Sequence, residues 1–180
     1  GSAVVVRVRK SDVKSLSRTA APWRLSKSRG RSARGPEPPR IVLDGCEDIE
    51  GRALLLVSAL HFGAAALAGW KVHFVVQGDA VVCAALDALR WEIGLDVEWL
   101  HDRQRDAVLP GARLFAAVCF RDVARLNLED IARHGVPALV AIQFPDFERH
   151  GAEALALQRA AHDPQLLCAE ILARLGVALP

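Results

Sequence analysis

Beyond Arg40, short apolar runs alternate along the chain with longer stretches of helical length. The runs consist mostly of Val, Ile, Leu, Phe and Ala, and several are bounded by glycine or charged residues, which predicts buried strands. We expect five strands, at 40–45, 71–78, 96–100, 112–120 and 137–142, and a short sixth at 152–157.

The stretches between these runs predict helices at 51–68, 79–94 and 163–175, and a short polar one within 101–109. Asp79 stands where an N-cap is expected, and Gly94 stands where a helix commonly stops. Strands separated by helices of this length imply parallel βαβ units with right-handed crossovers. The expected fold class is therefore α/β: a doubly wound, Rossmann-like parallel sheet of five or six strands with helices on both faces.

The first 39 residues differ from the rest in composition and charge. Residues 10–40 mix Ser, Arg, Lys, Gly and Pro without apolar periodicity, and the opening Gly1-Ser2 is typical of a tag remnant. Residues 1–40 hold 11 Lys+Arg against 2 Asp+Glu, a net +9, whereas residues 41–180 hold 12 against 19, a net −7. We therefore expect a basic, largely disordered arm over 1–39 and one folded, acidic domain over 40–180.

Cysteine spacing indicates whether metal sites or disulfides are expected, and hydropathy indicates whether a segment could span a membrane. The four cysteines form no CxxC pair and have no neighbouring histidine pair, so neither a zinc site nor a disulfide framework is expected. A cytoplasmic location, free or peripheral to a membrane, is the simplest. The uncharged stretch 53–70 reaches the lower length of a membrane span, but its Ala and Gly content and its position between two strands favour a buried helix. His61 and His73 stand in apolar segments and are expected to be hydrogen-bonded core residues.

Ligands of a doubly wound sheet bind beyond the carboxyl ends of the strands, near the point where the strand order reverses. Three loops are therefore candidates for a site: 45–52, 100–105 and 120–128. The third begins the segment "DVARLNLEDIARHGVP" (122–137), which sets Asp122 and Asp130 eight positions apart before a Gly/Pro stop. Ligand binding and helix capping are both consistent with these two acids.

Three segments resemble the C-terminal, donor-binding half of GT-B glycosyltransferases of family 4 (group 1), which transfer a sugar from a nucleotide-sugar with retention. "IVLDGCEDIEGRAL" (41–54) resembles the first strand, glycine turn and helix start of that family, and the 122–137 segment resembles its paired-acid segment. "HGAEALALQRAAHDPQLL" (150–167) resembles the region before the closing helix. The resemblance covers about 135 of the 180 residues.

The resemblance implies a site and a reaction. It implies that Asp122 contacts the sugar or the phosphate loop, that Asp130 binds the ribose, and that Arg52 with the turn at Gly45 holds the diphosphate. His101, which follows the third strand, is a candidate to face the base ring. In an active enzyme the leaving diphosphate is stabilised electrostatically, without a metal or another cofactor. The implied partners are a nucleotide diphosphate sugar and an acceptor-binding domain or partner protein, because the chain matches only the donor half.

Two positions depart from the family pattern. Val123 replaces the glycine that usually follows the first acid, and its branched Cβ resists the close approach of a phosphate. Asp44 stands where relatives with the "EGRAL" feature carry lysine, and a carboxylate there would repel a diphosphate. These departures favour a degenerate domain, whereas the paired-acid segment favours a functional one.

Each candidate residue also has a purely structural interpretation. Asn127 and Asp130 would form a variant of the capping box at a helix start. Arg52 would pair with one of the acids in 47–50, and His101 would be a solvated loop residue. The sequence leaves both interpretations open at every one of these positions.

A second hypothesis treats the chain as a non-catalytic interaction module that binds a protein partner or a polyanion through its basic arm and acidic domain. Trp23 lies among the Arg and Lys residues of 3–39, which suits binding to a nucleic acid or an anionic membrane surface. A solubilising or partner-docking arm is the alternative. Residues 3–9, "AVVVRVR", alternate at their end and would add a strand to a neighbouring sheet edge, which predicts a homodimer or a partner contact.

Overall fold

The computed structural model describes residues 37–45, 52–77, 79–119, 126–143 and 158–178. Their strands are β1 Arg40–Asp44, β2 Lys71–Val76, β3 Asp96–His101, β4 Leu114–Cys119 and β5 Ala138–Ile142. Their helices are α1 Arg52–Gly63, α2 Ala80–Ala88 with a π-helical end at Leu89–Ile93, a 3-10 turn at Asp102–Gln104, α3 Arg105–Val108, α4 Leu128–Arg133 and α7 Pro164–Leu175. The expected sixth strand at 152–157 and residues 1–36 of the arm lie outside the described residues.

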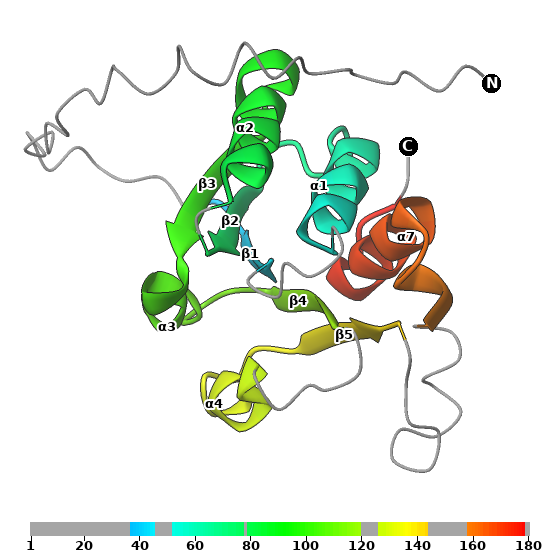
Figure 1. Cartoon of the computed structure of the whole chain (residues 1–180). Coiled ribbons are helices and arrows are strands. Elements are labelled where there is room, and N and C mark those ends of the chain that lie inside the picture. The colour runs from blue at the N-terminus through cyan, green and yellow to red at the C-terminus, as the bar shows by residue number, and fades with distance from the viewer. Residues whose placement is uncertain (1–36, 46–51, 78, 120–125, 144–157, 179–180) are drawn as a thin grey trace, which may run out of the picture. The chain divides into compact units, whose positions relative to one another are not determined.

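All five strands are parallel and pair in the order β3-β2-β1-β4-β5 (Figure 1). The central strand β1 pairs with β2 on one side and with β4 on the other, and its residues Ile41, Val42 and Leu43 are fully buried. A strand covered on both faces appears in the sequence as a continuous apolar run, which is why this strand was readily predicted. The predicted α/β class and the Rossmann-like sheet are confirmed for the described residues.

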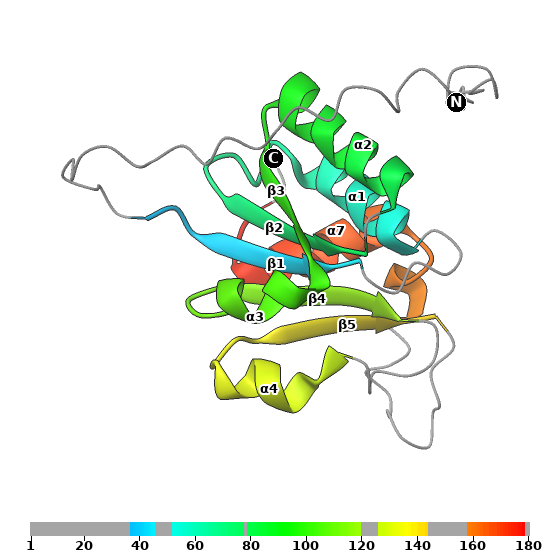
Figure 2. The same cartoon turned by 60° about the vertical axis from the view of Figure 1, so that its left-hand side comes forward.

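One face of the sheet is covered by α1, α2 and α7 (Figure 2). Leu43 and Phe74 from the sheet belong to the same core cluster as Leu56 of α1, Leu86 of α2 and Ile171 of α7. This cluster is the larger of the two cores, and it buries one side of α1 and α2, whereas Leu54, Phe62 and Val81 of the same helices are exposed.

The opposite face carries α3 and α4 and a smaller core. Val42 and Phe115 from the sheet share this core with Leu109, which follows α3, and with Ile131 of α4. Because alternate strand residues point to the same face, the side chain of Asp44 lies on this second face together with that of Val42. The polar end of β1 is therefore directed to the layer that contains α3.

Most of the predicted helix ends are confirmed. Asp79 Oδ1 accepts hydrogen bonds from the backbone N–H groups of Val81 at 2.7 Å and Val82 at 3.0 Å, and so caps α2. Gly94 follows the π-helical end in a left-handed conformation with φ 78°, which ends the helix where the sequence predicted. Asp163 caps α7 in the same way as Asp79 caps α2.

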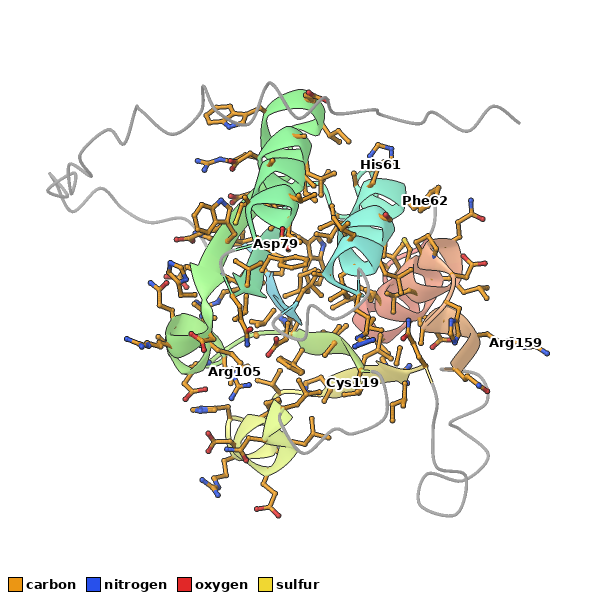
Figure 3. All side chains as sticks on the ribbon, viewed as in Figure 1. His61, Phe62, Asp79, Arg105, Cys119 and Arg159 are labelled. Carbon is orange, nitrogen blue, oxygen red and sulfur yellow. The ribbon has the colours of Figure 1, made fainter. Side chains whose placement is uncertain are left out.

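The first helix differs from its prediction. It ends at Gly63, and residues 64–69 form turns instead of continuing to position 68. His61 is exposed on α1 next to Phe62, which is 48% exposed, so the expectation that His61 is a core residue is wrong (Figure 3). The apolar run extends to the outer side of the helix, and hydropathy alone therefore does not show which side is buried. In the described part of the chain, no helix has the length and apolar character needed to cross a membrane.

We predict that Asp79→Ala lowers the free energy of unfolding by about 1 kcal/mol, because two N–H groups at the start of α2 lose their acceptor. Asp79→Asn is the matched control, since it keeps a side-chain oxygen at the N-cap and is expected to remain close to wild type. Urea unfolding followed by circular dichroism measures both. Equal losses in the two variants would show that the negative charge, and not the cap, stabilises the helix.

Candidate functional site

The candidate site lies at the carboxyl edge of the sheet, where the strand order reverses. β1 and β4 are neighbours in the sheet, but the chain continues from β1 to β2 on one side and from β4 to β5 on the other. The two connections leave this edge in opposite directions, which is the arrangement that forms ligand sites in doubly wound folds. Residues at the ends of β1, β4 and β5 and at the start of α1 therefore define the site.

Asp44, at the end of β1, is buried and paired with a cation. Its side chain is 4% exposed, and Asp44 Oδ2 lies 3.5 Å from Nη1 of Arg105, the first residue of α3. Arg105 is labelled in Figure 3. The sequence suggested that this carboxylate would repel a diphosphate, but the pairing with Arg105 offsets its charge at short range. Arg105 was not identified from the sequence, because no local pattern marks a contact across 61 positions.

Gly45 directly follows β1 and packs closely against its surroundings. Its backbone N–H donates to Val75 O at 2.8 Å, which extends the pairing of β1 with β2 by one residue. A Cβ atom at this position would lie 2.5 Å from Phe74 Cε1 and 3.1 Å from Ala53 Cβ. The close contacts with Phe74 of β2 and Ala53 of α1 are therefore a sufficient reason for glycine at position 45.

Arg52 is the first residue of α1 and is only 2% exposed. Its Nη1 donates to Oε1 of Gln143, the residue after β5, at 3.2 Å. The acids in 47–50 that the sequence offered as partners lie outside the described residues. The guanidinium group thus links the start of α1 to the end of β5 across 91 positions. Arg52 also has the wrong charge for the positive end of the helix dipole, so a nearby acceptor or anion stabilises it.

Gln143 connects three further parts of this edge. Its backbone N–H donates to Cys119 O at 2.9 Å, and its side-chain Nε2 donates to Ala161 O at 3.2 Å. Its carbonyl oxygen accepts from Gln158 Nε2 at 3.3 Å and lies 3.2 Å from His162 Nε2. Gln143 therefore fixes the ends of β4 and β5 to the segment before α7. Sequence reasoning missed it, since a glutamine after a strand carries no distinctive signal.

Asp130 lies in the first turn of α4, but the expected capping box is absent. Asn127 occupies the N-cap position in a left-handed conformation with φ 48°, and its side chain makes no capping hydrogen bond. The carboxylate of Asp130 instead pairs with Arg133 Nη1 at 2.9 Å, and its side chain is 26% exposed. The capping prediction for Asn127 and Asp130 is therefore wrong, because a left-handed N-cap directs its side chain away from the geometry that the box requires.

The predicted site residues do not all come together. Gly45 follows β1 and Arg52 begins α1, whereas His101 ends β3, the far strand of the sheet, and is exposed. The backbone N–H of His101 donates to Gln104 Oε1 at 3.0 Å. Asp130 comes from α4 on the other side of the switch point. Asp122, with the rest of 120–125, lies outside the described residues.

His73 is a buried titratable residue on β2, as the sequence predicted, but it is not a hydrogen-bonded one. It is 5% exposed, and neither ring nitrogen has a hydrogen-bond partner among the described residues. Its Nδ1 lies 3.6 Å from Oε2 of Glu98, which also pairs with Lys71 Nζ at 2.8 Å. Burial, and then the charge of Lys71, lower the pKa of His73 below its ordinary value of 6.5. The hydrogen bond from Lys71 lowers the pKa of Glu98.

Comparison with known proteins adds no family assignment: no protein-family model matches the chain, and no curated protein matches its sequence. Within the described ranges, no cluster of three or more His, Cys, Asp or Glu side chains could hold a metal ion.

We predict that Arg105→Gln lowers the free energy of unfolding by about 1–2 kcal/mol, because the buried carboxylate of Asp44 loses its cation. The double variant Asp44→Asn/Arg105→Gln is expected to show a coupling of at least about 0.5 kcal/mol in a double-mutant cycle. Arg103→Gln, on the adjacent exposed turn, is the matched control and should change stability by less than about 0.5 kcal/mol. Strictly additive losses would contradict a stabilising pair.

We predict that stability falls as the pH decreases through about 6.5 and that His73 causes part of this fall. Because the pKa of His73 is lower in the folded chain, the unfolded chain binds the proton first. The contribution of His73 to the free energy of unfolding is complete above pH 6.5, the pKa in the unfolded chain. It is lost as the pH falls toward the lower pKa of the folded chain. His73→Gln is expected to flatten the decline measured by urea unfolding between about pH 7 and pH 5. The pKa of Glu98 is also lower in the folded chain, so Glu98 too stabilises the fold less as the pH falls, but this loss begins only below about pH 4.5. An unchanged slope in the variant would overturn the assignment to His73.

Proposed function

We propose that the domain over 40–180 is a glycosyltransferase-like, nucleotide-sugar-binding domain that needs a separate acceptor-binding domain for transfer. The observation that carries this proposal is the carboxyl edge at the strand reversal. There, Gly45 follows β1, the buried Arg52 begins α1, and Asp44 at the end of β1 is paired with Arg105. This arrangement supports the proposal, because diphosphates bind at helix starts beside the strand reversal in doubly wound sheets.

Among the described residues, the charge of Asp44 opposes an anion less than the sequence suggested. Asp44 alone would repel a diphosphate, but Arg105 at 3.5 Å balances it, and α1 has no acidic residue in its first turn. Arg52 adds a positive charge at the start of the same helix. A diphosphate near this start would therefore meet N–H groups, the positive end of the helix dipole and a guanidinium group.

In an active complex, the reaction is transfer of a hexose from the nucleotide diphosphate sugar to an acceptor with retention. The bond between the sugar and the diphosphate breaks, a bond forms from the same sugar carbon to an acceptor hydroxyl oxygen, and the leaving diphosphate takes the negative charge that develops and the hydroxyl proton. Arg52 and the N–H groups at the start of α1 would stabilise that charge electrostatically. Asp130, which is 26% exposed, remains available to accept hydrogen bonds from ribose hydroxyls.

A second candidate function is that of a non-catalytic interaction module. It is favoured by the fact that two charged residues of the edge are engaged within the chain, Asp44 with Arg105 and Arg52 with Gln143. On this hypothesis, these internal contacts stabilise the carboxyl edge, and the edge binds no phosphate. On this hypothesis, the net charges of +9 over 1–40 and −7 over 41–180 would recruit the partner.

The two functions are separated by titration with UDP, GDP and ADP and with their sugars, followed by calorimetry and thermal unfolding. For the donor-site proposal, one nucleotide at about ten times its Kd is expected to raise Tm by about 3–6 °C. Asp130→Asn should weaken binding of that nucleotide about tenfold, because the charged acceptor for the ribose is lost. No stabilisation by any of the nucleotides or sugars at millimolar concentration would sink the donor-site proposal and leave the interaction module.

Arg133→Gln is the matched control for Asp130→Asn. Both variants break the same ion pair at 2.9 Å, but only one changes the proposed ribose ligand. Nucleotide affinity is therefore expected to fall in Asp130→Asn and to stay within about twofold of wild type in Arg133→Gln. Equal losses in both variants would mean that the ion pair orders α4, and Asp130 would then not be a ligand.

A further inference from the structure

A pocket lies at the amino edge of the sheet, opposite the candidate donor site. Its lining comes from the residues that lead into three strands, Pro39 before β1, Trp70 before β2 and Arg113 before β4, and from Arg174 and Leu175 at the end of α7. Its volume is about 430 Å³. In Figure 2 this edge is on the left, where the strands begin. Pockets for small organic ligands commonly have about 300–1,000 Å³, so this one is large enough for a ring with one charged substituent.

Two arginines make the pocket cationic. The side chain of Arg113 is exposed and forms no ion pair with an acid of the described residues, while its backbone N–H donates to Arg40 O at 2.8 Å. Arg174 Nη1 lies 3.2 Å from Glu170 Oε2, one helical turn earlier in α7. The lining therefore includes two arginines, one of which is paired with a carboxylate. Guanidinium groups bind phosphate and carboxylate oxygens through paired N–H donors.

The remaining walls are apolar and fixed in position. Trp70 is partly buried and packs against the large core, and its backbone N–H donates to Leu67 O at 3.0 Å. Pro39 O accepts from Lys71 N at 2.8 Å, which continues the β1–β2 pairing beyond the strand. An indole held by the core next to two guanidinium groups presents a planar apolar surface beside a positive charge. That combination recognises a planar ring that carries an anionic group.

We propose that the pocket formed by Trp70, Arg113 and Arg174 binds a nucleotide, with the base against the indole and the phosphate between the two guanidinium groups. A phosphate carries enough oxygens for both arginines, which come from different elements, to bind it at once. The site is separate from the carboxyl edge and does not rest on the donor-site proposal. The same chemistry is offered by a free nucleotide and by one unit of a single-stranded nucleic acid.

The test uses the full chain labelled with ¹⁵N and observes the indole N–H signals of its four tryptophans during titration with uridine monophosphate. Trp70→Phe assigns the Trp70 signal. That signal is expected to shift with uridine monophosphate, and at least about tenfold higher concentrations of uridine or inorganic phosphate should be needed for the same effect. No shift of the Trp70 signal at millimolar uridine monophosphate would overturn the proposal. An equal response to phosphate alone would also overturn it, since the ring would then not be recognised.

Arg113→Gln and Arg174→Gln change exposed side chains and are expected to leave the fold intact while weakening binding of uridine monophosphate about tenfold each. Arg159→Gln is the matched control: it changes an exposed arginine in the segment fixed to the carboxyl edge and should leave the titration unchanged. Equal affinity in all three variants would contradict a role for the two lining arginines. Binding at the donor site would persist in Arg113→Gln, so the two sites are distinguishable.

A second arm of the experiment identifies the source of the nucleotide. An oligouridylate of about ten units covers one typical single-strand binding site. If it shifts the Trp70 signal at least tenfold more tightly than the mononucleotide, the pocket accepts one unit of a nucleic acid strand. If the mononucleotide is equal or tighter, the pocket binds a free nucleotide. Both results support binding of a nucleotide in this pocket. They differ only in whether the nucleotide is free or part of a nucleic acid strand.

Discussion

The parallel pairing of β1 between β2 and β4 is the constraint on which the rest of the structure depends. β1 is covered on both faces, and each of its backbone polar groups must find a partner within the sheet, since water does not reach them. The two neighbours of β1 come from different parts of the chain, so the strand order must reverse beside it. That reversal places Gly45, the buried Arg52 and the paired Asp44 at the carboxyl edge of the sheet.

The strands and helices could be predicted because each depends on a local pattern. A continuous apolar run predicted β1 and β4, and an acid followed by an apolar helix predicted the cap at Asp79. The failures have one cause. His61 belongs to an apolar run and yet is exposed, and Asn127 occupies the N-cap position in a backbone conformation that no side-chain pattern reveals. Exposure and left-handed backbone geometry depend on neighbours that are distant in sequence.

The candidate site was only partly predictable for the same reason. The strand order placed Gly45 and Arg52 at the carboxyl edge before any contact was known. The partner of Asp44 lies 61 positions away, and that of Arg52 lies 91 positions away, so neither is visible in a local motif. An acid that seemed to disable the site is neutralised by a residue from the opposite half of the chain. Charges read from a sequence describe a site only after their partners are known.

The link between Arg52 and Gln143 also determines when this edge becomes complete during synthesis. A ribosome releases β1 and α1 long before β5, and the contact between these two residues closes a loop of 91 positions. Until β5 has paired with β4, Arg52 at the start of α1 lacks the contact with Gln143. The contact between Arg52 and Gln143 therefore forms only after β5 has been synthesised, and it joins the two halves of the sheet.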